Sequence, residues 1–423
     1  MPLAVVGLLP VVVVLVTSFI PSTTFITKRD CVARDAAGAC SKRGPAEAVQ
    51  FAVVPADASP AGSRLSVAGL KEYDDSNHIL FVTVREPELQ LFEYFLTKGN
   101  PGNSGFDSYE DRFGNVTPDQ DRQIAFEDMR NAKNDAYFAA LSKLGYPVTI
   151  ENGPAIVEQL SCLTVDDTGK CAKRTSAAEV LQPNDQITAI DETPVTLLPD
   201  LTPAIAAHKA GDTVTVHFKR DGKAMDGQVT LIAAGDDGRP LIGIRMADSR
   251  VVTIPNNIKI NFDTVDIGGP SAGLSFTLTL IDRLSPGDLT GGKRVAVTGT
   301  IDVDGKVGAI GGLQSKATAV RDAGAKYFIV PFNQGPADLA AAQRAAGPGV
   351  TLIPVKTLDE ALAALQQIGG APYVQPKEAT GSTATPTTTT PAATPAPAST
   401  PTSTPATAPA ATPTTGATTT TLG

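Results

Sequence analysis

Apolar residues recur along this chain with two different periods, which separate predicted strands from predicted helices. Short apolar runs bounded by Pro, Gly, Asp and Ser lie at Phe51–Val54, Leu65–Val67 and Ile79–Val84, and they predict β-strands. From Asp121 to Leu144 the apolar residues instead repeat every three to four positions, which predicts an amphipathic helix that ends near Gly145. The first third of the chain therefore combines strands with one long helix.

Two shorter helical patterns follow in the last third of the chain. One covers Ala272–Leu284 and begins after a Gly-Gly-Pro turn, and the other covers Leu313–Ala323. Between them, Val295–Val297 is predicted to be a strand. This part of the chain thus alternates helices with at least one buried strand.

The two ends of the chain differ from the regions between them. Pro2–Ile20 is a nearly continuous apolar run of about membrane-spanning length, which predicts a membrane anchor over residues 1–22, with a cleaved signal segment as the alternative. Lys and Arg residues follow this run and none precedes it, so the positive-inside rule by itself favours a cytoplasmic domain. Residues 371–423 are almost wholly Thr, Pro, Ala and Ser, which predicts a disordered tail.

Composition excludes some classes of function. The net charge is −9, and no basic patch with interleaved aromatic residues occurs, so we expect no nucleic-acid partner. Neither His-x-x-x-His nor Cys-x-x-Cys spacing is present, and we expect no metal and no other cofactor. Four cysteines form two short-range couples, Cys31 with Cys40 and Cys162 with Cys171, whose spacing suits local disulfides in an oxidising compartment, although four cysteines permit three pairings.

The strongest candidate chemistry lies at Ser271 and Lys316. Ser271 follows the Gly-Gly-Pro turn at the start of a predicted helix, where free backbone N–H groups carry partial positive charge suited to an oxyanion. Serine is also a favoured helix N-cap, so this feature alone does not predict catalysis. Lys316 lies on an otherwise apolar helical stripe, and burial of a lysine lowers its pKa toward a neutral amine that can act as a base. Together the two residues predict a Ser-Lys dyad.

These residues resemble the Lon-type serine peptidases over roughly Val251–Gly370. The resemblance is carried by four further segments: Gly-Pro-Ser-Ala-Gly around the serine, Val-Thr-Gly-Thr at 297–300, Gly-Lys-Val-Gly-Ala-Ile-Gly-Gly at 305–312 and Ala-Gly-Ala-Lys-Tyr-Phe-Ile-Val-Pro at 323–331. It implies that Ser271 is the nucleophile, that Lys316 is the base, and that supporting positions are Thr298, Gly269, Pro270 and Ala272.

The chain departs from that family at two points. Gly268 stands three places before the serine, where these peptidases often carry an acidic residue, and Asp266 is not assigned to the site because its side chain would face the other way on an extended segment. No ATPase domain is recognised before the peptidase, and Gly287–Lys293 matches phosphate-loop spacing by chance, since a strand follows it in place of a helix. We therefore expect flexible or unfolded substrates and no use of ATP.

The middle segment, residues 145–246, resembles a PDZ domain. The resemblance is carried by Leu181–Val195, an expected helix over Asp200–Ala207, and expected strands over Thr213–Phe218 and Gln228–Ile232. It implies that an extended peptide pairs with a sheet edge, and it assigns the peptide-binding loop to Gly145, Tyr146, Pro147 and Val148. Ser161–Thr175, which contains the second cysteine couple, is longer and more polar than the loop usual in such domains.

The predicted fold is α+β and multidomain. It comprises the anchor at 1–22, an extracytoplasmic region of strands and a helix at 23–144, the PDZ-like β domain at 145–246, a Lon-type α/β peptidase domain at 247–370 and the tail at 371–423.

The predicted function is an ATP-independent serine endopeptidase, a single-pass membrane protein with its catalytic domain outside the cytoplasm. Three features favour this location over the cytoplasmic one that the charge pattern indicates. They are the paired cysteines, the Thr- and Pro-rich tail and the resemblance to membrane-anchored PDZ-bearing relatives. A peptide-binding scaffold or chaperone at the membrane is the alternative function. A trypsin-like protease is disfavoured because its PDZ domain would follow the catalytic domain. Expected partners are protein or peptide substrates, and a homo-oligomer is left open.

Overall fold

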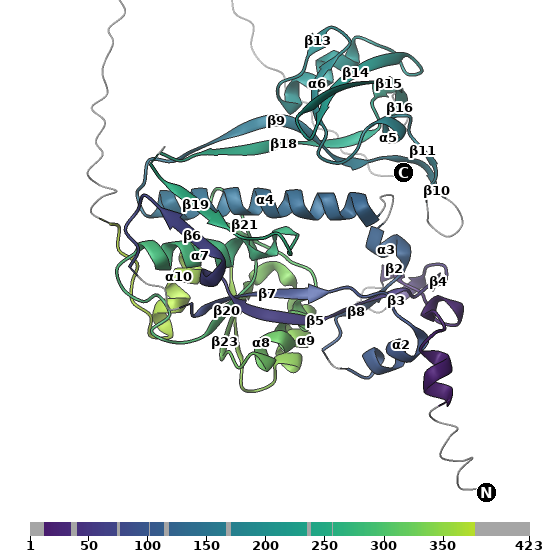
Figure 1. The fold of residues 1–423 in the computed structure, drawn as a ribbon. Helices are drawn as coiled ribbons and strands as arrows, with labels where there is room; N and C mark the ends of the chain where they lie inside the picture. Colours follow the sequence, from purple (N-terminus) through teal and green to yellow (C-terminus); the bar gives the residue numbers. More distant parts are fainter. Residues whose placement is uncertain are drawn as a thin grey trace, which may run out of the picture. The chain divides into compact units, whose positions relative to one another are not determined.

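The computed structural model describes most of the chain in eight stretches (Figure 1), namely residues 12–34, 40–73, 77–100, 102–113, 118–165, 171–234, 238–255 and 257–376. The predicted tail therefore lies almost wholly outside the described residues. Half of the predicted anchor, residues 1–11, also lies outside them. Within the described stretches, no helix combines the length and the apolar character that crossing a bilayer requires.

A mixed six-stranded sheet forms the centre of the larger domain, with the strand order β24-β23-β20-β7-β5-β8. Its strands are β5 (Phe51–Pro60), β7 (Ile79–Arg85), β8 (Gly105–Asp107), β20 (Val295–Val297), β23 (Tyr327–Pro331) and β24 (Thr351–Val355). Strands β7, β20, β23 and β24 run parallel, while β5 is antiparallel to both of its neighbours. The central strands are mostly apolar, with β20 and the first four residues of β7 fully buried, because both faces of the sheet are covered.

This sheet corrects the predicted domain division. β5 and β7 come from the region that was predicted to be separate from the peptidase domain, yet β7 pairs directly with β20. Residues 51–107 and 295–355 thus share one sheet, and no domain boundary separates 23–144 from 247–370. The strands themselves were predicted correctly, but their pairing joins segments that lie about half the chain apart, and periodicity alone does not report such pairing.

Helices cover both faces of this sheet (Figure 1). On one face lie α4 (Pro118–Lys143), α7 (Gly273–Leu284) and α10 (Leu358–Gln367), and on the other lie α8 (Leu313–Asp322) and α9 (Pro336–Ala346). The side chains of β7 pack alternately into the cores on the two faces of the sheet, because successive strand side chains point in opposite directions. Ile79 and Phe81 join the core under α4 and α7, whereas Leu80 and Val82 join the core under α8.

A stack of three aromatic rings fastens α4 to the core of the larger domain. The rings of Tyr137 and Phe262 lie 6.1 Å apart and nearly parallel, and those of Phe262 and Phe276 lie 4.2 Å apart. The Tyr137 hydroxyl oxygen also accepts the backbone N–H of Phe262 at 3.0 Å. Burial raises the pKa of Tyr137 to about 12, so this hydroxyl stays protonated at neutral pH. The long helix is therefore part of the core of the larger domain.

A second domain is inserted between α4 and β19 (Lys259–Phe262). Its sheet has the order β15-β14-β12-β9-β18, with β13 paired to β12. Its elements are β9 (Thr149–Leu160), α5 (Ala177–Val180), β12 (Gln186–Ile190), β13 (Thr193–Pro194), α6 (Leu198–Ala206), β14 (Thr213–Arg220), β15 (Lys223–Thr230) and β18 (Ile244–Thr253). They enclose a hydrophobic core of their own.

The inserted domain is joined to the rest through one ribbon of two strands (Figure 1). β9 and β18 are antiparallel partners from Thr149 opposite Thr253 to Leu160 opposite Ile244. The chain therefore enters and leaves this domain at neighbouring points.

The remaining described elements are short. They are β1 (Thr27–Lys28), β2 (Cys31–Arg34), β3 (Cys40–Arg43), β4 (Glu47–Ala48), β6 (Leu65–Ala68), α2 (Leu91–Lys98), α3 (Tyr109–Phe113), β10 (Cys162–Val165), β11 (Cys171–Arg174), β16 (Ile232–Ala234), β17 (Arg239–Leu241), β21 (Thr300–Ile301) and β22 (Val307–Gly308).

Both predicted cysteine couples lie on pairs of these short strands. Cys31 and Cys40 form the expected disulfide between β2 and β3, with their Cα atoms 5.6 Å apart. Cys162 and Cys171 begin the paired strands β10 and β11, but their side chains lie outside the description, so that disulfide stays a prediction.

Candidate functional site

The turn before α7 fixes the backbone of Ser271. Gly269 has φ of 81°, a conformation that favours glycine, and Pro270 begins the short 3-10 turn Pro270–Ala272 that leads into α7. The Ser271 carbonyl accepts the backbone N–H of Gly299 at 2.9 Å, and the Gly299 carbonyl accepts the N–H of Leu274 at 3.0 Å. The turn is thus fastened to the segment that follows β20.

The structure brings three of the predicted site residues together. The Lys316 amine lies 2.8 Å from Ser271 Oγ and 3.2 Å from Thr298 Oγ1. Thr298, which is fully buried, donates its hydroxyl to the Ser271 carbonyl at 3.2 Å. Lys316, on α8, is only 2 % exposed. The serine, the lysine and the threonine therefore meet as the sequence predicted.

Burial determines the charge of this lysine. It lowers the pKa of Lys316 to about 7, from an ordinary value of 10.5, because the charged form loses its hydration. A substantial fraction of the amine is therefore neutral at neutral pH. A neutral amine beside a hydroxyl can accept its proton, which makes Ser271 Oγ a candidate nucleophile.

Ser315 was not identified from the sequence, although it holds α8 in place. Its buried hydroxyl donates to the carbonyls of Val53 at 2.7 Å and Gly102 at 2.8 Å, and it lies 2.7 Å from the Ser104 hydroxyl. These bonds tie α8 to β5 and to the loop before β8. The only sequence signal was a polar residue next to Lys316 on a helix that is otherwise apolar on this side.

A cleft of about 340 Å³ opens at Ser271 and Lys316, with walls from β5, β7 and the loop before the serine. Asp266 lies in this wall, although the sequence did not assign it to the site. Arg64 donates to both Asp266 carboxylate oxygens, at 2.6 and 2.9 Å, and to the Asp263 carbonyl at 3.0 Å. The hydrogen bonds from Arg64 lower the pKa of Asp266 below its ordinary range. The loop before Ser271 is thereby clamped to the segment before β6.

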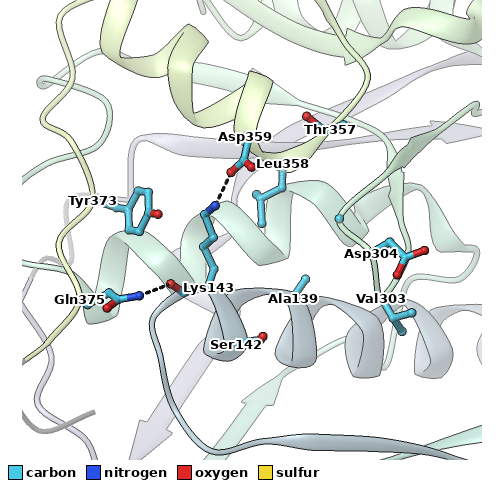
Figure 2. Close-up of a pocket in the computed structure, with 11 residues that line it drawn as sticks. Ala139, Ser142, Lys143, Val303, Asp304, Thr357, Leu358, Asp359, Tyr373 and Gln375 are labelled. Atoms are coloured by element: carbon cyan, nitrogen blue, oxygen red, sulfur yellow. Dashed lines mark hydrogen bonds and ion pairs between the residues drawn. The ribbon is translucent and has the colours of Figure 1, made fainter. Parts of the chain in front are cut away.

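A larger cavity of about 450 Å³ lies elsewhere, at the C-terminal end of α4 (Figure 2). Figure 2 shows the Lys143 amine directed at the Asp359 carboxylate, with which it forms an ion pair, and Tyr373 beside them. The Gln375 amide donates to the Lys143 carbonyl at 3.3 Å. These contacts attach the segment after α10 to α4. We assign this cavity a structural role, since it brings no nucleophile and base together.

One acidic cluster has the geometry of a metal site. Asp30, Glu47 and Asp111 present oxygen atoms within 4.8 Å of one another. Lys28 forms ion pairs with Asp30, at 3.0 Å, and with Asp111, so an ammonium group already occupies two of the three carboxylates. It does not point to a metal cofactor.

The predicted peptide-binding loop needs correction. Tyr146 is buried in the core of the larger domain, and Val148 packs against that same core. Gly145, Tyr146, Pro147 and Val148 directly follow α4 and remain attached to the core that its last turn enters, so they do not flank a groove of the inserted sheet. The better candidate is β18, an edge strand of that sheet. Ile244 on β18 packs against the core that contains Leu201 and Ile205 of α6.

Two family models match consecutive parts of the chain. A PDZ domain matches residues 150–231, and the Lon protease (S16) C-terminal proteolytic domain matches residues 255–367. The first match lies within the inserted domain. The second contains Ser271, Thr298 and Lys316.

Individual relatives agree with these matches. A Lon protease of Trichlorobacter lovleyi is 42% identical over 94 residues, which are 22% of this chain and 11% of that protein. Lon protease 2 of Bacillus subtilis is 36% identical over 109 residues, which are 25% of this chain and 18% of that protein. Matches of this kind span less than a fifth of the length of these relatives.

Among solved structures, the PDZ domain of an SdrC-like protein from Listeria monocytogenes is 30% identical. The match covers 21% of this chain and 85% of that structure's chain, with a TM-score of 0.16.

The reactivity of Ser271 should report the titration of Lys316. We expect the rate of labelling by a fluorophosphonate to rise with pH and to level off above a midpoint near 7, because only the neutral amine accepts the hydroxyl proton. Labelling rates measured from about pH 5 to 9 test this. A rate that still rises at pH 9, as an ordinary lysine pKa of 10.5 would require, would show that the amine is hydrated in solution, contrary to its burial.

Proposed function

We propose that this chain, which carries a Lon-type proteolytic domain and a PDZ domain, is a serine endopeptidase that uses Ser271 as its nucleophile and Lys316 as its base. One observation carries the proposal: the amine of a buried lysine lies 2.8 Å from the hydroxyl oxygen of a serine at the start of a helix. The match of this segment to a proteolytic domain supports the same assignment.

The proposed reaction has two stages. Neutral Lys316 takes the hydroxyl proton of Ser271 while Oγ attacks the peptide carbonyl carbon, and the new oxyanion is stabilised by the backbone N–H groups of Ser271 and Ala272 in the first turn. The protonated lysine then gives its proton to the leaving amine as the C–N bond breaks. Lys316 next takes a proton from water, which attacks the acyl carbon, and returns that proton to Ser271 Oγ as the bond between the acyl carbon and Oγ breaks. Thr298 holds the amine in line throughout.

A scaffold without turnover is the competing function, and the buried lysine disfavours it. A lysine in an apolar setting destabilises the fold whenever it is charged, and an apolar residue of similar size would fill the space without that cost. A binding protein gains nothing from this residue, whereas a peptidase needs it.

We propose further that turnover does not use ATP. The Gly287–Lys293 segment, which has the spacing of a phosphate loop, is a turn between α7 and β20. The backbone N–H groups of Thr290 and Gly292, which would cradle a phosphate in such a loop, donate to the Asp288 carboxylate at 2.7 and 2.5 Å. We therefore propose flexible or unfolded chains as substrates.

Removing either member of the dyad should abolish cleavage of an unstructured protein such as casein. Ser271→Ala lacks the nucleophile, and Lys316→Ala lacks the base, so each should reduce kcat by at least about a thousandfold. Lys316→Arg should be equally inactive, because a guanidinium stays protonated near neutral pH. The double variant should be no worse than either single variant.

Ser275→Ala is the matched control for this experiment. Ser275 is a buried serine one turn further along α7 whose hydroxyl donates to the Ala272 carbonyl, so its loss should leave kcat within about twofold. Addition of ATP and magnesium should not change the rate of the parent enzyme. Turnover by Ser271→Ala comparable with that of the parent would rule out the proposed nucleophile.

We propose that the PDZ domain presents substrates by adding them as a strand beside β18. Excising this domain should then slow cleavage of a natural protein partner while leaving cleavage of a short peptide intact, because tethering raises the local concentration of the scissile segment. Ile156 and Ala247 are opposite one another in the ribbon, so an Asn-Gly turn in place of residues 156–247 would close it as a hairpin.

The excised enzyme is compared with the intact enzyme by initial rates on both substrates. A large rise on the short peptide would mean that the PDZ domain blocks the site, and unchanged rates on both would mean that it recognises something other than substrate. Either result would overturn the presenting role.

We propose an extracytoplasmic address, with the chain anchored at the membrane by residues 1–22. The Cys31–Cys40 disulfide supports an oxidising compartment, since such bonds rarely persist in a reducing cytosol. Non-reducing peptide mapping of the protein from native membranes should recover both cysteine couples as disulfides. Four free thiols would instead favour the cytoplasmic orientation that the flanking positive charges suggest.

A further inference from the structure

Helix α4 packs directly on the loop that carries the nucleophile. A Cβ atom added at Gly268 would lie 2.8 Å from the Ala125 Cβ and 3.2 Å from its carbonyl carbon and oxygen, which is closer than side chains normally approach. The next residue, Gly269, donates its backbone N–H to the Ala125 carbonyl at 2.7 Å. Two consecutive loop residues therefore meet a single residue of α4.

The position of Ala125 is in turn fixed by the core. Along the same helix, Tyr137 stacks on Phe262 and accepts its backbone N–H, and Phe262 stacks on Phe276 of α7. The loop contact is thus made by a helix that the peptidase core holds in place.

The loop is held at a second point by the ion pair between Arg64 and Asp266. Only Pro270 separates the Gly269 contact from Ser271, and four residues separate Asp266 from it. Lys316 is carried by a separate helix, α8, and Thr298 bonds both its amine and the Ser271 carbonyl. Because the base cannot follow a displaced nucleophile, a shift of about 1 Å in this loop would lengthen the 2.8 Å contact enough to lower the rate sharply.

We propose that Ala125 is a positioning residue for Ser271 and acts through Gly268 and Gly269. Glycine is required at position 268 because the backbone and methyl group of Ala125 occupy the space of its side chain. This accounts for the departure from the acidic residue that similar peptidases often carry three places before the serine. The inference rests on the proposed peptidase function, and it assigns part of the geometry of the dyad to a helix about 140 residues away in the sequence.

The test places a methyl group into this contact. Gly268→Ala should lower kcat on a short peptide, and the rate of fluorophosphonate labelling, by at least about tenfold, with KM within about twofold. Adding Ala125→Gly should restore much of both rates, because it removes the opposing methyl group. Gly349→Ala is the matched control, since a Cβ there meets nothing within 4 Å, and it should leave both rates unchanged.

A second variant covers the case in which Gly268→Ala does not fold. Ala125→Val enlarges the same contact from the other side and should give the same loss of kcat. Gln123→Val, at an exposed position of α4, introduces the same β-branched residue into the helix and should not. Melting temperatures of all variants identify any global loss of structure.

The outcomes separate this inference from the proposed function. An inactive parent enzyme would refute the peptidase assignment itself. An active parent together with an active Gly268→Ala variant, or a double variant that Ala125→Gly fails to restore, would overturn the positioning role and leave the peptidase assignment standing.

Discussion

The exclusion of water from one amine is the constraint on which this structure depends. Lys316 is 2 % exposed and its pKa falls to about 7, so a substantial fraction of this amine is neutral at neutral pH, as the proposed base must be. Keeping that amine dry requires α8 to stay closely packed on the sheet. The hydrogen bonds of Ser315 to Val53 and Gly102 supply that attachment. The Thr298 hydroxyl accepts a hydrogen bond from the Lys316 amine. The chemistry is thus a property of the packing around the dyad as much as of its two residues.

The central sheet explains why the domain cannot be divided where the sequence suggested. Thr298 follows β20, which lies between β7 and β23, and β7 comes from the chain segment before the inserted domain. The hydrophobic layer under α8 likewise draws on β7 and β23 together. The site therefore rests on strands from both sides of the insertion, and the PDZ domain interrupts a single core without sharing it.

The sequence predicted what is local and missed what is distant. Gly-Pro-Ser and the lysine stripe are short patterns whose residue types reflect their own surroundings, so Ser271 and Lys316 could be identified from the order of residues. Thr298 was assigned only through the resemblance to Lon-type peptidases. The Arg64–Asp266 clamp joins residues 202 positions apart, and the contact of Ala125 with Gly269 joins two ordinary residues. In both contacts, the sequence around one residue gives no indication of its partner. The placement of Gly145 to Val148 failed for the same reason, because the packing of Tyr146 on a remote core decides which domain the loop follows.

Because the pKa of Lys316 depends on burial, the proposed activity can begin only when folding is complete. In an unfolded or partly assembled chain Lys316 is hydrated and regains its ordinary pKa of 10.5, so at neutral pH it is a cation and cannot accept the Ser271 proton. Under the proposed mechanism, a newly made chain therefore cannot cleave itself or its neighbours until β7, β20 and β23 have come together beneath α8. Completion of the core would then be the activating step, without removal of a propeptide, and renewed access of water to the amine would stop turnover without a covalent change.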